Sequence, residues 1–462
     1  MEENIQGMHI KARKAFKKVE FWSQQKVDEM VAAVGWEWQK EETAKALAKL
    51  AVDESGMGVY EDKVAKIRSK TRGTLWNMRS AKTCGLIDDD KNRGLKTFAK
   101  PIGVIVNVVP CTNPESTICC FGLSILKTRN AMIVSPHPKT QGSSYLTVEH
   151  GRKALKKIGA PEDLLQCIKN TSREKATVLM KVCDFAVATG GTALIKVVYA
   201  AGKPCQTVGA GNVISIVDET VDIPSTARKI VKSKTANNSA SCSSENAVAI
   251  YHGIYDKMID ALKSQGGYLC TTEEREKLRK YMWPDGTHLN RDVVAKPVSH
   301  IAEQVGIDVP PTTRFIMVLG EEPGPKDRFS GEKLSPVLTV WKWSNFVEIV
   351  ERVKKMLSFS GEGHSVSIHS LNEDRQMMLA EKTNVVRVIC NMPHAMANSG
   401  SWFSGLPFTD SLGCGTWAGN ITTDNINYKH FLNFTLLSVP IEEYVPSEEE
   451  IFKDYLEKWG RD

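Results

Sequence analysis

Residues 101–115 read Pro-Ile-Gly-Val-Ile-Val-Asn-Val-Val-Pro-Cys-Thr-Asn-Pro-Glu, and this stretch decides the fold. The β-branched run that ends at Val109 is typical of a strand buried on both faces of a parallel sheet. Asn113-Pro114-Glu115 then predicts a helix start, with an N-cap, a first-turn proline and an acidic residue near the positive helix end. We expect this helix to run to about Lys127 and residues 131–134 to form the next strand.

The strand–helix–strand pattern repeats farther along the chain. Residues 184–188 predict a strand, Thr189-Gly190-Gly191 a tight turn, and residues 192–200 a short helix before a strand at residues 204–208. Repeats of this kind imply a doubly wound parallel sheet, which binds ligands at the carboxyl ends of its strands. A dinucleotide is the expected ligand, although the two-glycine turn lacks the full G-x-G-x-x-G pattern and also fits ordinary turn chemistry.

A second α/β segment follows, with strands expected at residues 213–217, 247–251, 315–318, 337–340 and 385–390. Residues 5–80 have the three-and-four spacing of packed helices, and the loop-rich residues 281–311 are a candidate cover for the site. The carboxyl-terminal segment carries an apolar stripe that suits docking on a neighbouring subunit or, equally, on its own domain. The expected parts are a cofactor-binding domain (residues 1–211 and 401–427), a catalytic domain (212–400) and an oligomerisation or docking segment (428–462).

Length and composition agree with at least two domains, because 462 residues exceed the size at which a single core keeps growing. The net charge of +6 is spread among acidic residues, which argues against nucleic acid and mildly favours anionic small molecules such as phosphorylated cofactors. The polar amino terminus and the lack of a stretch of roughly 20 apolar residues predict a cytoplasmic protein without a membrane span. Eleven cysteines without a C-x-x-C pair predict reduced thiols and no metal site.

Cys242 is the candidate nucleophile. It lies in Asn237-Asn238-Ser239-Ala240-Ser241-Cys242-Ser243-Ser244-Glu245, among small polar residues, whereas packing cysteines usually have apolar neighbours. Small side chains let the backbone approach a substrate closely. The alternative is a merely tolerated small residue, because reactivity depends on surroundings that a sequence does not show.

Several runs, taken in order, make the chain resemble the aldehyde dehydrogenase superfamily, and specifically its CoA-acylating branch, over nearly its whole length. They are Pro110-Cys111-Thr112-Asn113-Pro114, Ser135-Pro136-His137-Pro138-Lys139, Ala188-Thr189-Gly190-Gly191, Gly209-Ala210-Gly211-Asn212, Lys234 through Glu245, Gly361-Glu362-Gly363-His364 and Leu412-Gly413-Cys414-Gly415-Thr416-Trp417. Each run alone is weak, but the ordered set is specific. The resemblance implies the aldehyde dehydrogenase fold, with a Rossmann-like cofactor domain and an α/β catalytic domain.

The resemblance also implies a mechanism. Cys242 attacks an aldehyde carbonyl to form a thiohemiacetal, and hydride then passes to NAD or NADP to leave a thioester. The oxyanion is held by the backbone N–H of Cys242 and the side-chain amide of Asn113, a residue that could instead only cap a helix. Glu332 resembles the glutamate of the family's E-x-F-G-P-V run, which holds the nicotinamide ribose; a solvated loop carboxylate is the alternative.

Further cofactor contacts follow from the same resemblance. His137 comes directly after a predicted strand, where such folds bind nucleotides. Lys139 either pairs with a 2′-phosphate of NADP or is a solvated charge, and its run lacks the carboxylate of NAD-selective members. His364 either contacts the pantetheine or adenine nucleotide of coenzyme A or closes a turn. The remaining expected contacts are Thr189, Gly190, Gly191, Gly209 and Gly211.

Val208 decides how the product leaves. Hydrolytic members place a glutamate base in an E-L-G-G-K run, and the matching run here is Val208-Gly209-Ala210-Gly211-Asn212. Valine cannot activate water, so the thioester should persist until the thiol of coenzyme A attacks it. Glu245 is the nearest candidate base for hydrolysis instead. A non-catalytic scaffold is the remaining alternative, but it would have no need to keep Asn113, Cys242 and Glu332 together.

Two local resemblances concern the aldehyde. Gly56-Met57-Gly58-Val59-Tyr60-Glu61-Asp62-Lys63 resembles enzymes acting on succinate semialdehyde, and Ser241 through Asn246 with Gly413 through Trp417 resembles sulfoacetaldehyde enzymes. Both substrates are anions and need a donor-rich or cationic pocket. The candidates are Asn238, Ser239, Ser241 and Ser399, which could also be plain loop residues. Sulfoacetaldehyde is favoured over acetaldehyde and succinate semialdehyde.

The family's habit predicts a homo-oligomer, either a dimer or a dimer of dimers. The chain stops soon after Ile441, so we expect a stand-alone enzyme without the alcohol dehydrogenase half of the bifunctional relatives.

Overall fold

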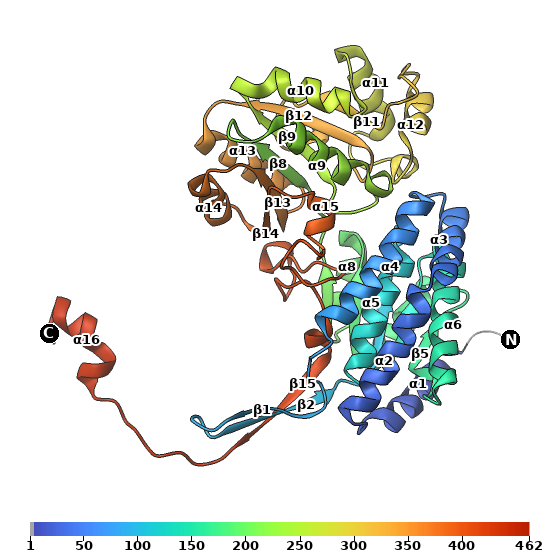
Figure 1. Ribbon diagram of the computed structural model, residues 1–462, viewed down its shortest axis with the longest axis vertical. Helices are drawn as coiled ribbons and strands as arrows, with labels where there is room; N and C mark the ends of the chain where they lie inside the picture. Colours follow the sequence, from blue (N-terminus) through green and yellow to red (C-terminus); the bar gives the residue numbers. More distant parts are fainter. Residues whose placement is uncertain (1–3, 462) are drawn as a thin grey trace.

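The computed structural model describes residues 4–461 (Figure 1). One layer is a five-stranded parallel sheet with the strand order β5-β4-β3-β6-β7. Its strands are β3 (Val104–Val108), β4 (Ala131–Ser135), β5 (Leu165–Cys167), β6 (Phe185–Thr189) and β7 (Cys205–Val208). The chain crosses from edge strand β5 back to β6, which lies beside β3. Open α/β sheets bind ligands at such a switch point, and the Rossmann-like prediction is confirmed.

The stretch at residues 101–109 differs from its prediction in one detail. It is not a single strand, because β2 (Leu95–Pro101) ends there and β3 begins at Val104. Gly103 lies between them with φ 137°, and a Cβ at this position would lie 2.1 Å from Oδ2 of Asp184, so only glycine fits. Apolar residues on both sides of Gly103 hid the break. All of β3 is buried, as expected for a strand covered on both faces.

Helices pack around this sheet and on one another. They are α1 (Ile5–Val19), α2 (Gln24–Gln39), α3 (Glu41–Ser55), α4 (Tyr60–Asn77), α5 (Pro114–Lys127), α6 (Gln141–Lys157), α7 (Arg173–Val182) and α8 (Thr192–Ala200). Helix α2 contacts α4, α5 and α6, and Figure 1 shows these helices side by side. The predicted helical spacing is confirmed, since Val27, Met30, Val31, Val34 and Trp38 are all buried in α2.

A second parallel sheet has seven strands in the order β10-β11-β12-β9-β8-β13-β14. Its strands are β8 (Val213–Val217), β9 (Glu245–Tyr251), β10 (Gly267–Leu269), β11 (Phe315–Leu319), β12 (Val337–Trp343), β13 (Gly363–His369) and β14 (Val385–Cys390). Its helices are α9 (Ile223–Thr235), α10 (Tyr255–Ser264), α11 (Thr272–Met282), α12 (Val298–Val305), α13 (Phe346–Phe359), α14 (Glu373–Lys382) and α15 (His394–Ala397). The predicted strands are all present, and β10 and β13 are additional.

Strand β13 carries His364, whose predicted contact with coenzyme A stays a prediction. The residue lies in the second position of a fully buried strand, and its backbone N–H also closes the preceding turn by donating to the carbonyl oxygen of Gly361 at 3.1 Å. The strand carries buried serines and histidines, and this polar composition concealed it. It lies between β8 and the edge strand β14 and runs parallel to both.

A three-stranded antiparallel arm leaves the body of the molecule (Figure 1). It joins β1 (Gly85–Asp90) and β2 to β15 (Leu432–Ser438), and the chain continues through an extended segment to α16 (Glu448–Trp459). No residue of α16 is buried, so this helix does not pack on its own domain. Among the described residues, the helices are too short or too polar to cross a membrane.

Candidate active site

Cys242 lies in a tight segment between α9 and β9. The preceding turn, η3 (Ala236–Ser239), has three consecutive residues with left-handed φ values: 50° at Asn237, 51° at Asn238 and 59° at Ser239. Such values are unfavourable for residues other than glycine, least so for asparagine, and persist where surrounding contacts enforce them. The nucleophile is therefore carried by a strained, well-anchored loop.

The anchors come from the start of α4. The backbone N–H of Asn237 donates to Oδ2 of Asp62 at 2.6 Å, and its Oδ1 accepts from the N–H of Val59 at 2.7 Å. Its Nδ2 donates to Oδ1 of Asn113 at 3.1 Å. Asn237 thus joins the nucleophile loop to α4 and to the beginning of α5.

His364 lies directly against Cys242. Its Nε2 is 3.2 Å from Sγ of Cys242, and its Nδ1 is 2.7 Å from Oγ of Ser365. Nδ2 of Asn398 donates to the same Ser365 hydroxyl at 3.0 Å and holds it in place. The imidazole ring is therefore oriented by the Ser365 hydroxyl at Nδ1 and by Sγ of Cys242 at Nε2. This is the arrangement of an activated thiol nucleophile. The pairing was not predicted, because the two residues are 122 positions apart in the sequence.

The protonation states of this pair follow from burial. Burial, then the charges of Glu332 and Cys414, raise the pKa of the Cys242 thiol to about 12. Burial, then the nearby guanidinium of Arg387, holds the pKa of His364 well below its usual range. At neutral pH the pair is a thiol beside a neutral imidazole, which is able to accept the thiol proton.

Gly211 packs on Cys242 and connects it to Glu332. A Cβ at Gly211 would lie 2.1 Å from the carbonyl oxygen of Cys242, so no larger residue fits. The N–H of Gly211 donates to Oε1 of Glu332 at 3.1 Å, and burial raises the pKa of this carboxyl to about 7. Glu332 is therefore an anchored, half-buried carboxyl and not a freely solvated loop residue.

Asn113 occupies the N-cap position of α5, but its side chain makes no capping hydrogen bond. Its Nδ2 donates instead to the carbonyl oxygen of Ala240 at 2.8 Å, two residues before Cys242. The side chain is buried and fixed at both amide atoms. The amide thus belongs to the nucleophile loop, which is compatible with a role as oxyanion donor; that role stays a prediction.

The carboxyl ends of β6 and β7 lie at the same edge of the sheet as the start of α8, where the sequence predicts cofactor contacts. Helix α8 begins after Gly191, which makes no side-chain cap, and its first turn contains no acidic residue. A Cβ at Gly191 would meet open space. Free N–H groups at a helix N-terminus favour an anion. Thr189 is hydrogen-bonded to Ser411, Gly190 lies in the turn, and Gly209 follows β7 beside Cys414.

His137 and Lys139 follow β4 at the same edge of the sheet. Nδ1 of His137 accepts from the backbone N–H of Lys139 at 3.1 Å. Burial, Lys139 and Arg291 lower the pKa of His137. Arg291 belongs to the segment predicted to cover the site, which also contains the helix α12. Ala295 of this segment packs with Met57 and Ala240.

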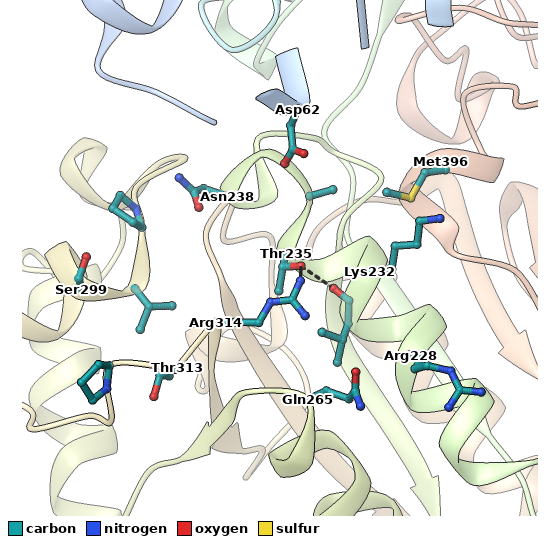
Figure 2. Close-up of a pocket in the computed structure, with 15 residues that line it drawn as sticks. Asp62, Arg228, Lys232, Thr235, Asn238, Gln265, Ser299, Thr313, Arg314 and Met396 are labelled. Carbon is teal, nitrogen blue, oxygen red and sulfur yellow. Dashed lines mark hydrogen bonds between the residues drawn. The ribbon is translucent and has the colours of Figure 1, made fainter. Parts of the chain in front are cut away.

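The residues predicted to bind the substrate do not all lie in one cavity. Asn238 lines a surface cavity of about 660 Å³, together with the cations Arg228, Lys232 and Arg314 (Figure 2). Among the described residues that line it, Cys242 is not included. The structure therefore places Asn238 in a cavity next to the nucleophile loop, not beside the thiol itself.

The three serines differ in their availability. Ser239 is fully buried and its hydroxyl donates to the carbonyl oxygen of Lys234, so it supports the loop. Ser241 is half-buried, and its Oγ accepts from the N–H of Ser243 at 3.2 Å. Ser399 accepts a hydrogen bond from Nζ of Lys70 at 2.7 Å. Of these side chains, those of Ser241 and Ser399 can still face a ligand.

Sequence reasoning missed two basic groups around the site. Arg387 of β14 is buried, and its Nη2 donates to the carbonyl oxygens of His364 at 3.3 Å and Gly413 at 2.8 Å. Lys66 and Lys70 of α4 lie three and seven residues after Lys63. Lys63 and Lys70 are buried, and Lys66 is partly exposed. That spacing marks one helix face, but without a structure it is indistinguishable from a solvated charged face.

Comparisons with known proteins point to a single family. A model of the aldehyde dehydrogenase family matches residues 1–276. A sulfoacetaldehyde dehydrogenase from an Acholeplasma species is 40% identical over 450 residues, which cover 96% of this chain and 93% of that protein. An acylating sulfoacetaldehyde dehydrogenase from Bilophila wadsworthia is 38% identical, with 97% and 98% of the two chains covered. An acetylating succinate-semialdehyde dehydrogenase from Clostridium kluyveri is 38% identical, with 98% and 99% covered.

Among solved structures, an acetylating aldehyde dehydrogenase from Geobacillus thermoglucosidasius superimposes with a TM-score of 0.93 at 30% identity. The match covers 96% of this chain and 98% of that one.

Proposed function

The chain belongs to the aldehyde dehydrogenase family, in its CoA-acylating branch, and from this we propose that it oxidises a small anionic aldehyde, with sulfoacetaldehyde favoured, to the acyl-CoA. The observation that carries the proposal is the Cys242–His364 pair, 3.2 Å apart, with Val208 where hydrolytic members have a glutamate base. Two relatives that are named for sulfoacetaldehyde support the choice of substrate. Acetaldehyde and succinate semialdehyde are the alternatives.

The enzyme uses NAD or NADP as hydride acceptor and coenzyme A as co-substrate. The structure fits a dinucleotide, because the open N-terminus of α8 at Gly191 can receive a pyrophosphate and the carboxyl of Glu332 can accept hydrogen bonds from a ribose. Gly190, Gly209, His137 and Lys139 complete the proposed cofactor-binding set. A nicotinamide bound there would supply the hydride acceptor, so that Cys242 would be left carrying a thioester.

His364 begins the reaction by accepting the proton of Cys242. The transfer is unfavourable in the empty site, since the thiol holds its proton more tightly than the imidazole does. It becomes favourable as Sγ attacks the aldehyde carbon, because the negative charge then moves to the carbonyl oxygen. The backbone N–H of Cys242 and the amide of Asn113 are the proposed donors to this oxyanion, and each such donor contributes about 3 kcal/mol to lowering the barrier.

His364 also serves the acyl transfer. After its first proton leaves to solvent, the imidazole accepts the thiol proton of coenzyme A, whose sulfur attacks the thioester carbon. The tetrahedral intermediate collapses to acyl-CoA, and the departing Cys242 sulfur takes the proton from His364. The balance is one aldehyde, one coenzyme A and one oxidised nicotinamide converted to acyl-CoA, reduced nicotinamide and one proton.

The glutamate base of hydrolytic members has no counterpart in this scheme. Val208 ends β7 and carries no titratable group. Glu245, the candidate named from the sequence, is fully buried at the start of β9, and burial raises its pKa to about 7. A carboxyl without access to solvent cannot activate a water molecule for the thioester.

The test is formation of reduced nicotinamide from sulfoacetaldehyde, succinate semialdehyde and acetaldehyde, with and without coenzyme A and with each nicotinamide cofactor. We expect turnover to require coenzyme A and kcat/KM to be highest for sulfoacetaldehyde. Full turnover without coenzyme A would show a hydrolytic enzyme, with Glu332 as the next candidate base. The highest kcat/KM for acetaldehyde would refute the anionic substrate.

We also propose the roles of the parts. Residues 1–211 and 401–427 bind the cofactor, residues 212–400 carry the nucleophile, and residues 428–462 join subunits into a homo-oligomer. The exposed arm and α16 support the last role.

A further inference from the structure

A cluster of charged residues connects α4 to the loop before β15. Nζ of Lys66 forms an ion pair with Oδ1 of Asp410 at 3.1 Å, and Ser116 of α5 donates a hydrogen bond to Oδ2 of the same carboxylate. Lys70, one turn farther along α4, donates to the carbonyl oxygen and hydroxyl of Ser399 at 2.5 Å and 2.7 Å. It also donates to the carbonyl oxygen of Gly400 at 3.2 Å.

The two lysines differ in what they can still bind. Lys70 is buried, and three oxygens occupy its ammonium hydrogens. The side chain of Lys66 is 24% exposed, and among residues 4–461 its ammonium group forms an ion pair with Asp410 alone. Lys66 and Lys70 lower the pKa of Asp410 against the effect of burial, so this carboxylate is ionised at neutral pH. Two cations and one anion leave the cluster with an excess positive charge.

The cluster lies next to the nucleophile loop. Ser116 is one helical turn beyond Asn113 on α5, so the two side chains share a face of the helix. Asn113 in turn contacts the carbonyl oxygen of Ala240, two residues before Cys242. The positive charge of Lys66 also acts on Cys242, because it lowers the pKa of that thiol against the rise caused by burial.

The geometry points to Lys66 as the residue that binds the sulfonate or carboxylate of the aldehyde and so selects anionic substrates. This inference rests on the proposed function, since it names the group that holds the substrate's charge. An ammonium group with free hydrogens forms short, charge-assisted hydrogen bonds with either anion. Asp410 and Ser116 act as positioning residues, because they hold the ammonium group of Lys66 in place. Ser399 is fixed by Lys70, which lies one turn after Lys66 on the same face of α4.

The test compares the unmodified enzyme with Lys66→Met and Lys66→Arg. The measured quantity is the ratio of kcat/KM for sulfoacetaldehyde, and separately for succinate semialdehyde, to kcat/KM for acetaldehyde. We expect Lys66→Met to lower the ratio at least about tenfold through a higher KM for the anion, and Lys66→Arg to retain most of it. The two anionic aldehydes distinguish a sulfonate site from a carboxylate site. Arg72→Gln, which neutralises an exposed cation of the same helix, should leave the ratio unchanged.

A second measurement does not depend on turnover. Alkylation of Cys242 by iodoacetamide should be slowed by 2-hydroxyethanesulfonate in the unmodified enzyme and much less in Lys66→Met, or in Lys66→Gln if the methionine variant does not fold. An unchanged ratio and unchanged protection in a folded variant would overturn the role of Lys66 while CoA-dependent turnover stands. An unmodified enzyme with no preference for either anion would refute both this role and the proposed substrate. CoA-independent turnover would refute acylation alone.

Discussion

His364 is the residue whose contribution is most directly testable. Replacement by Gln removes the base beside Sγ of Cys242, and the loss of a general base lowers kcat by about 10²- to 10⁴-fold. The expected companion result is slower alkylation of Cys242 at neutral pH. His369→Gln is a matched control, since His369 is buried at the other end of the same strand and has no contact with the nucleophile. Equal loss of activity in both variants would mean that β13 is being disturbed and not the base.

Gly211 tests the close packing beneath the nucleophile. A methyl group there would lie 2.1 Å from the carbonyl oxygen of Cys242, so Gly211→Ala must displace the loop or the N–H that holds Glu332. We expect kcat/KM to fall at least about tenfold, because small misplacements of a reacting group are costly. Gly405→Ala, at a position where a Cβ meets open space, should retain full activity. Full activity of Gly211→Ala would contradict the packing argument.

The raised pKa of Glu332 predicts that cofactor binding depends on pH. Burial raises the pKa of its carboxyl to about 7, so the uncharged form predominates below that pH and the carboxylate above it. The carboxylate is the better acceptor for ribose hydroxyl groups. The KM for the nicotinamide cofactor should therefore fall as the pH rises from about 6 to about 8, and Glu332→Gln should abolish this change. A KM that rises with pH in the unmodified enzyme would rule out the ribose role.

At the scale of elements, the strained turn η3 predicts a separable stability effect. Asn237→Gly removes the side-chain contacts to Val59 and Asn113, at a cost of about 1–3 kcal/mol in the free energy of unfolding. Asn237→Ala should cost about 1 kcal/mol more, because alanine tolerates the φ of 50° less well than glycine. Urea unfolding of the two variants gives the difference. If the alanine variant were as stable as the glycine variant, the turn would not be strained.

The elements also show what the sequence could and could not predict. The apolar strands β3, β8 and β14 were predictable, because short runs of β-branched residues are typical of strands buried in a parallel sheet. Strand β13 was not, since buried Ser365 and Ser367 make it read as polar. The ordered motifs located Cys242, Asn113 and Glu332. The pairing of Cys242 with His364 instead depends on β9, β8 and β13 lying next to one another in the sheet. Pairing across a sheet leaves no trace in the local sequence.

The same limit explains the missed lysines. Lys66 and Lys70 belong to an amphipathic helix on which basic residues are expected to face water. Their contacts with Asp410 and Ser399 join segments more than 300 residues apart, as for the Lys70–Ser399 separation of 329. Only the packing of α4 against the loop before β15 turns a charged helix face into part of the site.

At the scale of the whole molecule, the arm and α16 predict an assembly larger than a monomer. Figure 1 shows them extending away from both sheets, and β15 and α16 expose Phe434, Leu436, Ile451, Phe452 and Trp459 by 52% to 64%. Large apolar surfaces of this kind mark interaction sites.

Light scattering after size exclusion should give at least a dimer for the full chain. Truncation after residue 439 should lower the assembly state, whereas Met377→Ser, on the exposed face of α14, should not. Because no residue of α16 is buried in the body of its own chain, a truncated monomer should unfold at nearly the same temperature as a full-length monomer. A full-length chain that is monomeric in solution would refute the role of residues 428–462 in assembly.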